Sequence, residues 1–190
     1  QDCITHVVVQ DPHAICTSDP SLSIGGDVET ETNLGVANVA MTLNIHPPVS
    51  LVLQTQTDAQ GDFAFSNLPP ASLGYTLTPD KDNNHLDGVS TYDLVLISKH
   101  ILGLEYLNSP YKIIAADANH SESVTTFDIV EIRKLILGIY DDFPDNTSWR
   151  FVDKSFTFPN PANPFQSVFP ESIFHADTMP NIISHDFVCV

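Results

Sequence analysis

DNNHLDGVSTYDLVLISKHILG, residues 82–103, recurs as DANHSESVTTFDIVEIRKLILG at residues 117–138. Each copy joins a loop rich in Asp, Asn, Ser and Thr to a short amphipathic run that stops at a glycine. Loops of this composition are also ordinary turn chemistry, but two copies in the same register favour a shared function. The sequence therefore predicts a duplicated loop–helix unit.

The spacing of oxygen-bearing residues in both loops is typical of a calcium loop. Calcium takes six to eight oxygen ligands, and a twelve-residue loop supplies them from positions 1, 3, 5, 7 (a backbone carbonyl), 9 and 12. The second loop places at these positions Asp117, Asn119, Ser121, the Ser123 carbonyl, Thr125 and Asp128. The first loop places there Asp82, Asn84, Leu86, the Gly88 carbonyl, Ser90 and Asp93. We expect two Ca²⁺ ions, one in each loop.

The two loops depart from this pattern in different ways. Leu86 offers only its backbone carbonyl, which predicts that the first site is the weaker one. Glu122 stands at position 6, where a glycine normally takes the sharp turn, and in the first loop the glycine comes one place late, at Gly88. Val89 and Val124 both occupy position 8, which predicts that the loops pair back to back through a short strand.

Each loop leads into a predicted capped helix. Ser90 with Asp93, and Thr125 with Asp128, match the capping box, so each acid serves both the helix start and the metal. Glycine after the last helical residue is a typical stop signal. The predicted helices are residues 94–102, ending at Gly103, residues 129–137, ending at Gly138, and residues 111–115, starting after Ser109-Pro110.

The pattern D-x-N-x5-S/T-x2-D, followed by a hydrophobic helix and I-L-G, resembles the dockerin family over residues 80–140. Dockerins are duplicated calcium modules that plug into cohesin domains in bacterial surface assemblies, so the resemblance implies that calcium orders this fold. Loop positions 10 and 11 contact the cohesin in that family, and here these are Thr91, Tyr92, Thr126 and Phe127. Tyr92 and Phe127 are bulkier than the usual small hydroxyl residues, which leaves open whether they bind a cohesin-like partner or pack in the core.

Composition favours a secreted, acidic, globular protein. Lys and Arg number 7 against 24 Asp and Glu, so the net charge is −17. Such a surface repels nucleic acid and anionic membranes and attracts divalent cations. With 42% hydrophobic residues the chain is globular, and no apolar run approaches the roughly 18 residues of a membrane span. We expect no nucleic-acid partner, no membrane insertion and an extracellular or cell-surface location.

Residues 18–79 read as short strands separated by Gly, Pro, Asn and Asp turns. The segments SIGGDVETE, VANVAMTLN, SLVLQTQTD, DFAFSNL and GYTLTPD predict a small Ig-like β-sandwich. GDVETETNLGVANVAMTLN and the residues after it resemble the carboxypeptidase-regulatory-like and collagen-adhesin B-type modules of bacterial surface proteins. No lysine precedes residue 81, so a Lys–Asn isopeptide bond is absent. The predicted fold class is mainly β with a small α part.

Residues 1–17, DCITHVVVQDPHAIC and its flanks, contain one strand at 4–10. The segment resembles the last strand of a hyalin-repeat module, and a strand without its sheet is unstable alone. It therefore pairs with the neighbouring sandwich or with another molecule by strand addition. The side chains expected to contact a partner are Ile4, Val7 and Val9.

Residues 141–190 are rich in Pro and aromatic residues, and we expect an extended layer that wraps the calcium unit and ends in a strand. Strands are predicted at residues 150–158 and 186–190, and Phe187 and Val190 are a second candidate contact for a partner. Three cysteines are consistent with an oxidising compartment. Cys3 with Cys16 is the favoured disulfide, but Cys189 with a neighbour's Cys3 and an unpaired Cys189 stay open.

Catalysis finds little support, because no nucleophile-elbow, zinc-protease, phosphate-loop or C-x-x-C motif occurs and the eight histidines lack ligand spacing. The order of modules resembles the distal region of large secreted bacterial surface proteins. Two non-catalytic functions follow. The first is a subunit of a calcium-stiffened filament or fibril, assembled head to tail from copies of itself by β-strand addition. The second is a dockerin-like plug that anchors a larger adhesin to a cohesin-like domain.

Overall fold

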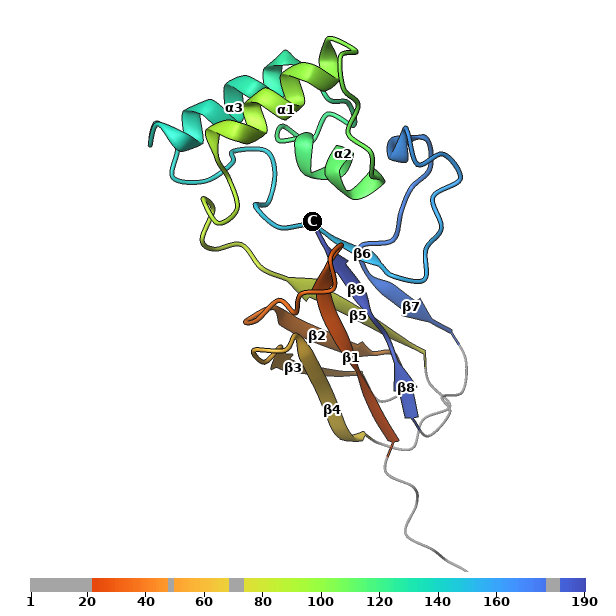
Figure 1. Cartoon of the computed structure of the whole chain (residues 1–190). Coiled ribbons are helices and arrows are strands. Elements are labelled where there is room, and N and C mark those ends of the chain that lie inside the picture. The colour runs from red at the N-terminus through yellow and green to blue at the C-terminus, as the bar shows by residue number, and fades with distance from the viewer. Residues whose placement is uncertain (1–21, 48–49, 69–73, 177–181) are drawn as a thin grey trace, which may run out of the picture.

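The chain is mainly β, with a small helical part at one end (Figure 1). The computed structural model describes residues 22–47, 50–68, 74–176 and 182–190. Their strands form two sheets, and three short α-helices gather beside one end of the sheets. The predicted class, mainly β with a small α part, is confirmed.

The first sheet joins strands from both ends of the described chain. Its order is β4-β1-β9-β6, and β8 also pairs with β1. The strands are β1 (Leu22–Thr30), β4 (Asp62–Leu68), β6 (Phe151–Asp153), β8 (Ile182–Ser184) and β9 (Phe187–Cys189). β1 is antiparallel to β4 and parallel to β8 and β9. β9 therefore finishes at the end of the sheet that lies beside the helices, and β1 starts at the opposite end (Figure 1).

The second sheet is antiparallel throughout, in the order β3-β2-β5-β7. Its strands are β2 (Ala40–Ile45), β3 (Leu51–Gln56), β5 (Tyr75–Asp80) and β7 (Ile173–His175). The strand segments predicted before residue 81 are thus observed as β1 to β5. The prediction drew the sandwich from residues 18–79 alone, whereas the observed sheets also take four strands from beyond residue 150.

One apolar core lies between the two sheets. Along β2, Met41, Leu43 and Ile45 are buried while the residues between them are partly exposed, which is the two-residue period of a strand with one inward face. Tyr75 from the second sheet and Phe187 from the first are fully buried in the same cluster. Each large apolar side chain buried this way contributes roughly 1.5–3 kcal/mol, so β9 belongs to the stable core.

β8 and β9 are separated by a break at His185 and Asp186, which lies against β1. A Cβ at Gly26 would lie 1.8 Å from the His185 carbonyl oxygen, so only glycine lets β1 approach the chain here. The His185 amide donates to the Gly25 carbonyl at 2.9 Å. The break is therefore held against β1, and β8 and β9 continue along the same side of that strand.

The helices are α1 (Thr91–Ile101), α2 (Pro110–Ala116) and α3 (Thr126–Ile136), close to their predicted places. Both predicted capping boxes are present, and Ser109 caps α2 with Pro110 in its first turn. Gly103 and Gly138 take the positive φ expected after a helix. α1 and α3 share a small core that includes Ile97 and Ile132.

Val89 and Val124 are half-buried in that same small core, but no β-ladder joins the loops within the fully described stretch 74–176. The predicted short strand between the loops is wrong in that respect. The two helices hold the unit together by packing their apolar faces, so the loops meet through side chains and not through a backbone ladder.

The C-terminal segment contacts the loops before it enters the sheets. The Asn146 amide donates to the Asp117 carbonyl at 2.9 Å, and the Trp149 indole donates to the Asn83 carbonyl at 2.8 Å. The predicted strands at 150–158 and 186–190 are shorter, as β6 and β9, and a 3-10 turn occupies Pro164–Gln166. The segment does touch the duplicated loop–helix unit, and its strands then complete the sheets.

The predicted strand at residues 4–10 and the predicted disulfide between Cys3 and Cys16 lie outside the described residues. Cys189 is described, is buried in β9 and has no disulfide partner among the described residues. Burial raises the pKa of Cys189 to about 12. A thiol in that state is a poor nucleophile, and the pairing of Cys189 with a neighbour's Cys3 stays a prediction.

Candidate functional site

The second loop is organised around the buried carboxylate of Asp117. The side chain is fully buried where α2 ends. Its Oδ1 accepts from the Ser121 amide at 2.8 Å, and its Oδ2 accepts from the Glu122 amide at 2.9 Å. Loop position 1 is therefore held by backbone amides from positions 5 and 6, which curls the loop around one carboxylate.

Asp128, at loop position 12, is also fully buried. Its Oδ2 accepts from the Thr125 amide at 2.7 Å and from the Thr125 hydroxyl at 3.2 Å, which completes the capping box. Its Oδ1 accepts from the Asn119 amide at 3.2 Å and so joins position 12 to position 3. This bond draws the start and the end of the loop together.

Two carboxylates are thus buried in one loop, and no ion pair to Asp117 or Asp128 occurs among the described residues. Burying a charge is costly unless it is paired or coordinates a metal. The side-chain oxygen of Asn119 is also buried without a hydrogen-bond partner. An orphaned oxygen beside two buried carboxylates fits a hard divalent cation such as Ca²⁺.

The remaining second-loop candidates lie close together. The Ser121 hydroxyl donates to the Ser123 carbonyl at 3.2 Å, which brings positions 5 and 7 into contact. Among the described residues, no group of three His, Cys, Asp or Glu side chains is placed to hold a metal. The site would therefore depend on amide, hydroxyl and carbonyl oxygens in addition to its two acids, as calcium sites commonly do.

The backbone turns of the two loops follow the predicted positions. Glu122 has φ of 59°, so a non-glycine residue takes the left-handed turn at position 6. Gly88 has φ of 78°, one position later, as expected. A left-handed conformation costs a non-glycine residue of order 1–3 kcal/mol, so the second loop carries strain that the first avoids at this turn.

The first loop is open to solvent. Asp82 is exposed, and its Oδ1 accepts from the Ser148 amide at 3.2 Å instead of from its own loop. Asn84 and Ser90 are exposed, and Leu86 points its apolar side chain toward solvent. Asp93 binds only its own cap, with its Oδ2 2.7 Å from the Ser90 amide. Positions 1 and 12 of this loop are not drawn together by hydrogen bonds.

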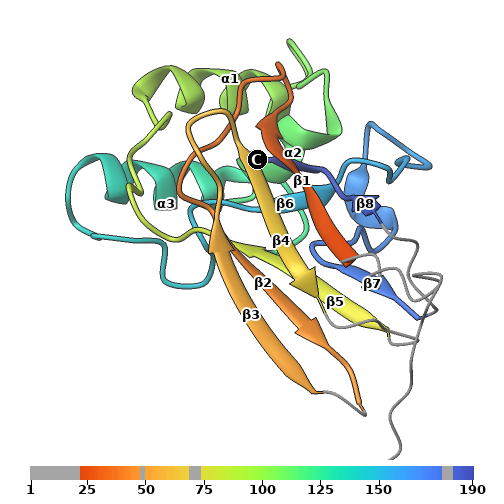
Figure 2. The same ribbon diagram turned by 90° about the horizontal axis from the view of Figure 1, so that it is seen from below.

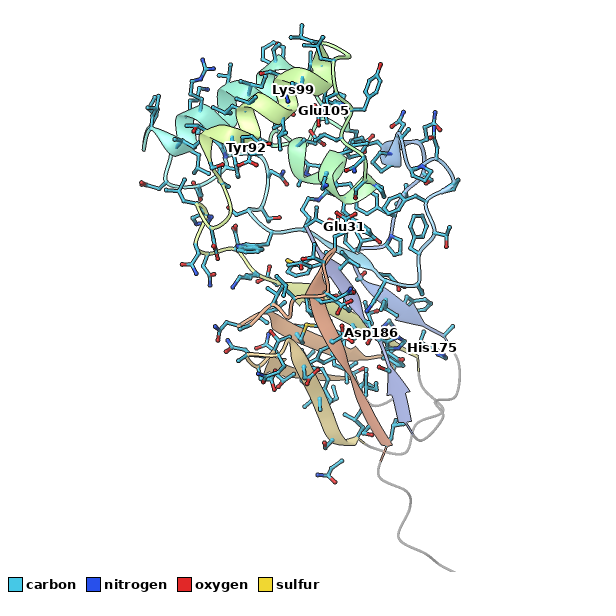
Figure 3. All side chains as sticks on the ribbon, in the orientation of Figure 1. Glu31, Tyr92, Lys99, Glu105, His175 and Asp186 are labelled. Carbon is cyan, nitrogen blue, oxygen red and sulfur yellow. The ribbon has the colours of Figure 1, made fainter. Side chains whose placement is uncertain are left out.

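Tyr92 and Phe127 lie outside the core, with 63% and 70% of their surfaces exposed. Thr91 and Thr126 beside them are also exposed. Figure 3 shows Tyr92 at one end of α1 and the Lys99–Glu105 pair at the other. Exposed apolar side chains recur at equivalent places on the two helices and their C-caps, Tyr92, Val95 and Leu102 along α1 and Phe127, Val130 and Leu137 along α3. We call these the paired apolar stripes.

Phe187 and Val190, the other predicted partner contacts described by the structure, lie in and just after β9. Phe187 is fully buried and Val190 is half-buried, since β9 lies between β1 and β6 of its own chain. β6 pairs with residues 187–189 only, so among the described residues no strand lies on the outer side of β8. The His185 amide faces β1, and alternation along the strand turns the Ser184 amide toward that open side.

Two histidines near this open edge were missed by sequence reasoning. The Tyr75 hydroxyl is hydrogen-bonded to Nε2 of His185, and its ring stacks on His175 with 5.5 Å between centroids. Burial raises the pKa of Tyr75 to about 12 and lowers the pKa of His185. Nδ1 of His175 is buried without a hydrogen-bond partner. Their only sequence signal was their position beside strands, because the pairing partners lie far along the chain.

No family model and no curated protein matches the chain. One solved structure shows a slight likeness, the C-terminal fragment of the pilus adhesin SpaC from Lactobacillus rhamnosus GG, with a TM-score of 0.27 and 20% sequence identity. The aligned region covers 33% of this chain and 23% of that fragment. None of the described helices is long and apolar enough to cross a membrane.

Proposed function

We propose that the chain is a non-catalytic, calcium-binding subunit of an extracellular filament or fibril that assembles head to tail by β-strand addition. The observation that carries this proposal is the outer side of β8, on which no strand of the described residues lies, next to a core that β9 and β6 cover on that sheet. An unpaired row of backbone groups is a template for a strand from another chain.

The surroundings of this edge support a missing strand. Seen from below, β7 and β8 lie on the same side of the two sheets (Figure 2). His175, the last residue of β7, keeps a buried ring nitrogen without a partner. A strand entering beside β8 would offer backbone acceptors to the Ser184 amide, for which the described residues supply no partner.

The donor in this proposal is the segment at residues 4–10, with Ile4, Val7 and Val9 as its apolar side chains. β9 is the poorer candidate, because Phe187 would have to leave its own core. β1 starts at the end of the sheet opposite to the helices (Figure 1). β8 pairs with residues 23–25 at that same end, so copies propagate into a filament only where the donor of one copy enters the edge of the next and not its own edge or that of a reciprocating partner.

Calcium would stiffen the subunit through the C-terminal segment. Both loops are bonded to residues 146–149, through the Asp117 and Asn83 carbonyls and the Asp82 side chain. The next residues form β6, which pairs with β9. Ordering the loops therefore orders the segment that enters the first sheet, which links the metal to the sheet that offers the open edge.

Ser184→Pro tests this edge directly, with Ser184→Ala as its matched control. Both changes remove the Ser184 hydroxyl, which donates to Asp186 at 3.2 Å, but only proline also removes the outward amide. We expect Ser184→Ala to assemble like the wild type and Ser184→Pro to stay monomeric by light scattering after gel filtration. Assembly by Ser184→Pro, folded by circular dichroism, would contradict this edge as the acceptor.

The paired apolar stripes favour a second candidate, a dockerin-like plug that binds a cohesin-like domain. Large exposed apolar side chains grouped on one surface commonly mark protein interaction sites. A soluble one-to-one complex with a cohesin domain, weakened by Tyr92→Ser and Phe127→Ser together and not by Val52→Ser on β3, would support it. No self-assembly by the isolated chain together with such a complex would replace the filament proposal.

A further inference from the structure

β3 is the outermost strand of the second sheet on the side opposite to β7. It pairs with β2 over its whole length, Leu51–Gln56, and no strand of the described residues pairs with its other side. β4 follows β3 in the chain but pairs with β1 in the first sheet. Figure 2 shows β3 on the outside of β2, away from β5 and β7. Neither calcium binding nor the strand addition proposed at β8 uses this edge.

The hydrogen bonds at the end of β3 show which of its backbone groups face outward. The Thr57 amide donates to the Val39 carbonyl at 3.0 Å, so the backbone of Thr57 faces the strand that continues into β2. Backbone groups alternate between the two sides of an antiparallel strand, and the ladder with β2 keeps one register throughout. The amides and carbonyls of Val52, Gln54 and Gln56 therefore face outward, and all three side chains are exposed.

β3 lacks the features that protect edge strands from pairing with another chain. β4, the long edge strand of the first sheet, begins at the exposed Asp62 and takes a positive φ of 57° at Asn67. Charges and irregular backbone of this kind are the usual protection of an edge. β3 has the sequence LVLQTQ, without a charge, a proline or a positive φ. Its edge is therefore a regular template for a further strand.

The region without charge extends well beyond β3. No Asp, Glu, Lys or Arg occurs between Glu31 and Asp58, in a chain with a net charge of −17. This region includes all of β2 and β3. Two copies of so acidic a chain repel each other over most of their surfaces, whereas a basic partner would be attracted to the acidic surfaces instead. The edge of β3 is therefore where a second copy meets the least repulsion.

We propose that two copies of the chain pair through their β3 strands, antiparallel and about a twofold axis at Gln54. Gln54 of one copy then lies opposite Gln54 of the other, and Val52 lies opposite Gln56 of the other copy. Each outward residue exchanges both of its backbone hydrogen bonds with its counterpart, so the edge is complementary to itself. The contact closes on itself and joins copies in pairs, which makes it separate from the head-to-tail contact proposed at β8.

Disulfide cross-linking tests this pairing whether or not the chain forms filaments. In the proposed register the two Cα atoms of residue 54 lie about 5.5 Å apart, which a disulfide can span. The two Cα atoms of residue 52 lie about 14 Å apart, which it cannot span. Val52→Cys is therefore a matched control for Gln54→Cys, on the same exposed edge.

After oxidation, we expect Gln54→Cys to give at least five times as much covalent dimer as Val52→Cys, with the bridge mapped between the two copies of residue 54. A mixture of Val52→Cys and Gln56→Cys should form a covalent dimer between residues 52 and 56. Equal cross-linking of Gln54→Cys and Val52→Cys would overturn the proposed register. No bridge at residue 52, 54 or 56 would overturn the pairing, as it would if another segment occupied this edge.

Gln54→Pro tests the backbone contact, with Gln54→Ala as its control. Both changes remove the side chain, whose Nε2 donates to the Thr42 hydroxyl at 3.3 Å, but only proline removes the outward amide. Both are made together with Ser184→Pro, which removes the proposed head-to-tail contact. By sedimentation velocity, we expect the Gln54→Ala chain to form dimers and the Gln54→Pro chain to dimerise at least tenfold more weakly.

Equal dimerisation by a Gln54→Pro chain that is folded by circular dichroism would overturn the β3 contact. Dimers that persist in Ser184→Pro while filaments are lost would show that the two contacts are separate. If Ser184→Pro still forms filaments, the head-to-tail proposal at β8 fails, and the cross-linking of residue 54 still decides the pairing of β3.

Discussion

The two loops share a sequence pattern but differ in how they are closed. In the second loop, Asp117 and Asp128 are fully buried and hold the backbone of their own loop. In the first, Asp82 is exposed and bonds outward to the Ser148 amide, so the loop stays open. The difference shows that the same residue spacing does not give two loops the same structure, because the hydrogen bonds of a carboxylate depend on the groups around it.

Leu86 offers a physical reason for the difference. The hydroxyl of Ser121 at the equivalent place bonds inside its loop, to the Ser123 carbonyl, whereas the side chain of Leu86 offers no hydrogen bond and lies in solvent. The side chain at position 5 therefore helps to close the second loop and does not help to close the first. We expect the second loop to dominate calcium-dependent stability.

The largest effect should come from Asp117→Ala. This change removes a charged ligand and leaves the Ser121 and Glu122 amides without their acceptor, which we expect to cost about 3 kcal/mol in saturating calcium. Asp82→Ala, at the same position of the exposed loop, should cost about 1 kcal/mol or less. Thermal unfolding followed by circular dichroism measures both, and equal shifts would refute the ranking of the loops.

Removing calcium should cause the second-largest loss in the free energy of unfolding. If ligand is present at about 100 times its dissociation constant, its removal lowers the free energy of unfolding by about 2.7 kcal/mol. We expect most of this loss to disappear in Asp128→Ala but to persist in Asn84→Ala, since Asn84 belongs to the exposed loop. Melting curves with calcium and with EGTA give the comparison. A calcium response that survives in Asp128→Ala and vanishes in Asn84→Ala would reverse the assignment.

Adding a side-chain oxygen to the first loop should reduce the difference in calcium affinity between the two loops. Leu86→Asp places a carboxylate at position 5, and we expect it to strengthen the weaker calcium-binding event by about tenfold, or about 1.4 kcal/mol. Isothermal titration calorimetry resolves the two events. Leu86→Ala is the control, since it removes the exposed side chain without adding oxygen. The same affinity in Leu86→Asp and Leu86→Ala would show that position 5 does not limit this loop.

The smallest effects should come from the backbone turns. Gly88 has a positive φ, and a Cβ there would meet nothing within 4 Å, so Gly88→Ala should cost about 1 kcal/mol from backbone strain alone. Glu122→Gly should instead stabilise the second loop by roughly 0.5–1 kcal/mol, because glycine relieves the same strain. Urea unfolding measures both changes. If both substitutions change the free energy of unfolding in the same direction, the left-handed turn at one of these positions is contradicted.

Local features of this chain were readable from its sequence. The capping boxes at Ser90 and Thr125, the stops at Gly103 and Gly138, and the strands before residue 81 all depend on residues close together in the chain. Each of these features depends on a hydrophobic period or a capping residue within a single segment, so it can be predicted without knowing the tertiary structure. The sequence alone does not decide whether Tyr92 is exposed, because an aromatic residue at a helix start suits a core and an interface equally well.

The pairing of strands that are far apart in the chain could not be predicted from the sequence. β1 lies parallel to β8 and β9, which come more than a hundred residues later, and no local pattern specifies such a partner. The burial of Asp117 was equally hidden, since it depends on α2 and on Asn146 in the C-terminal segment. The Tyr75–His185 contact arises in the same way, from elements that meet only in three dimensions.

Negative-stain electron microscopy of the purified chain, in millimolar calcium and again with excess EGTA, tests the central claim most directly. We expect filaments with calcium that lose their order when EGTA is added. The same preparation lacking residues 1–17 should remain as single particles while its calcium-dependent melting is unchanged. Single, monodisperse particles of the full chain under both conditions would contradict a calcium-stiffened, self-assembling subunit.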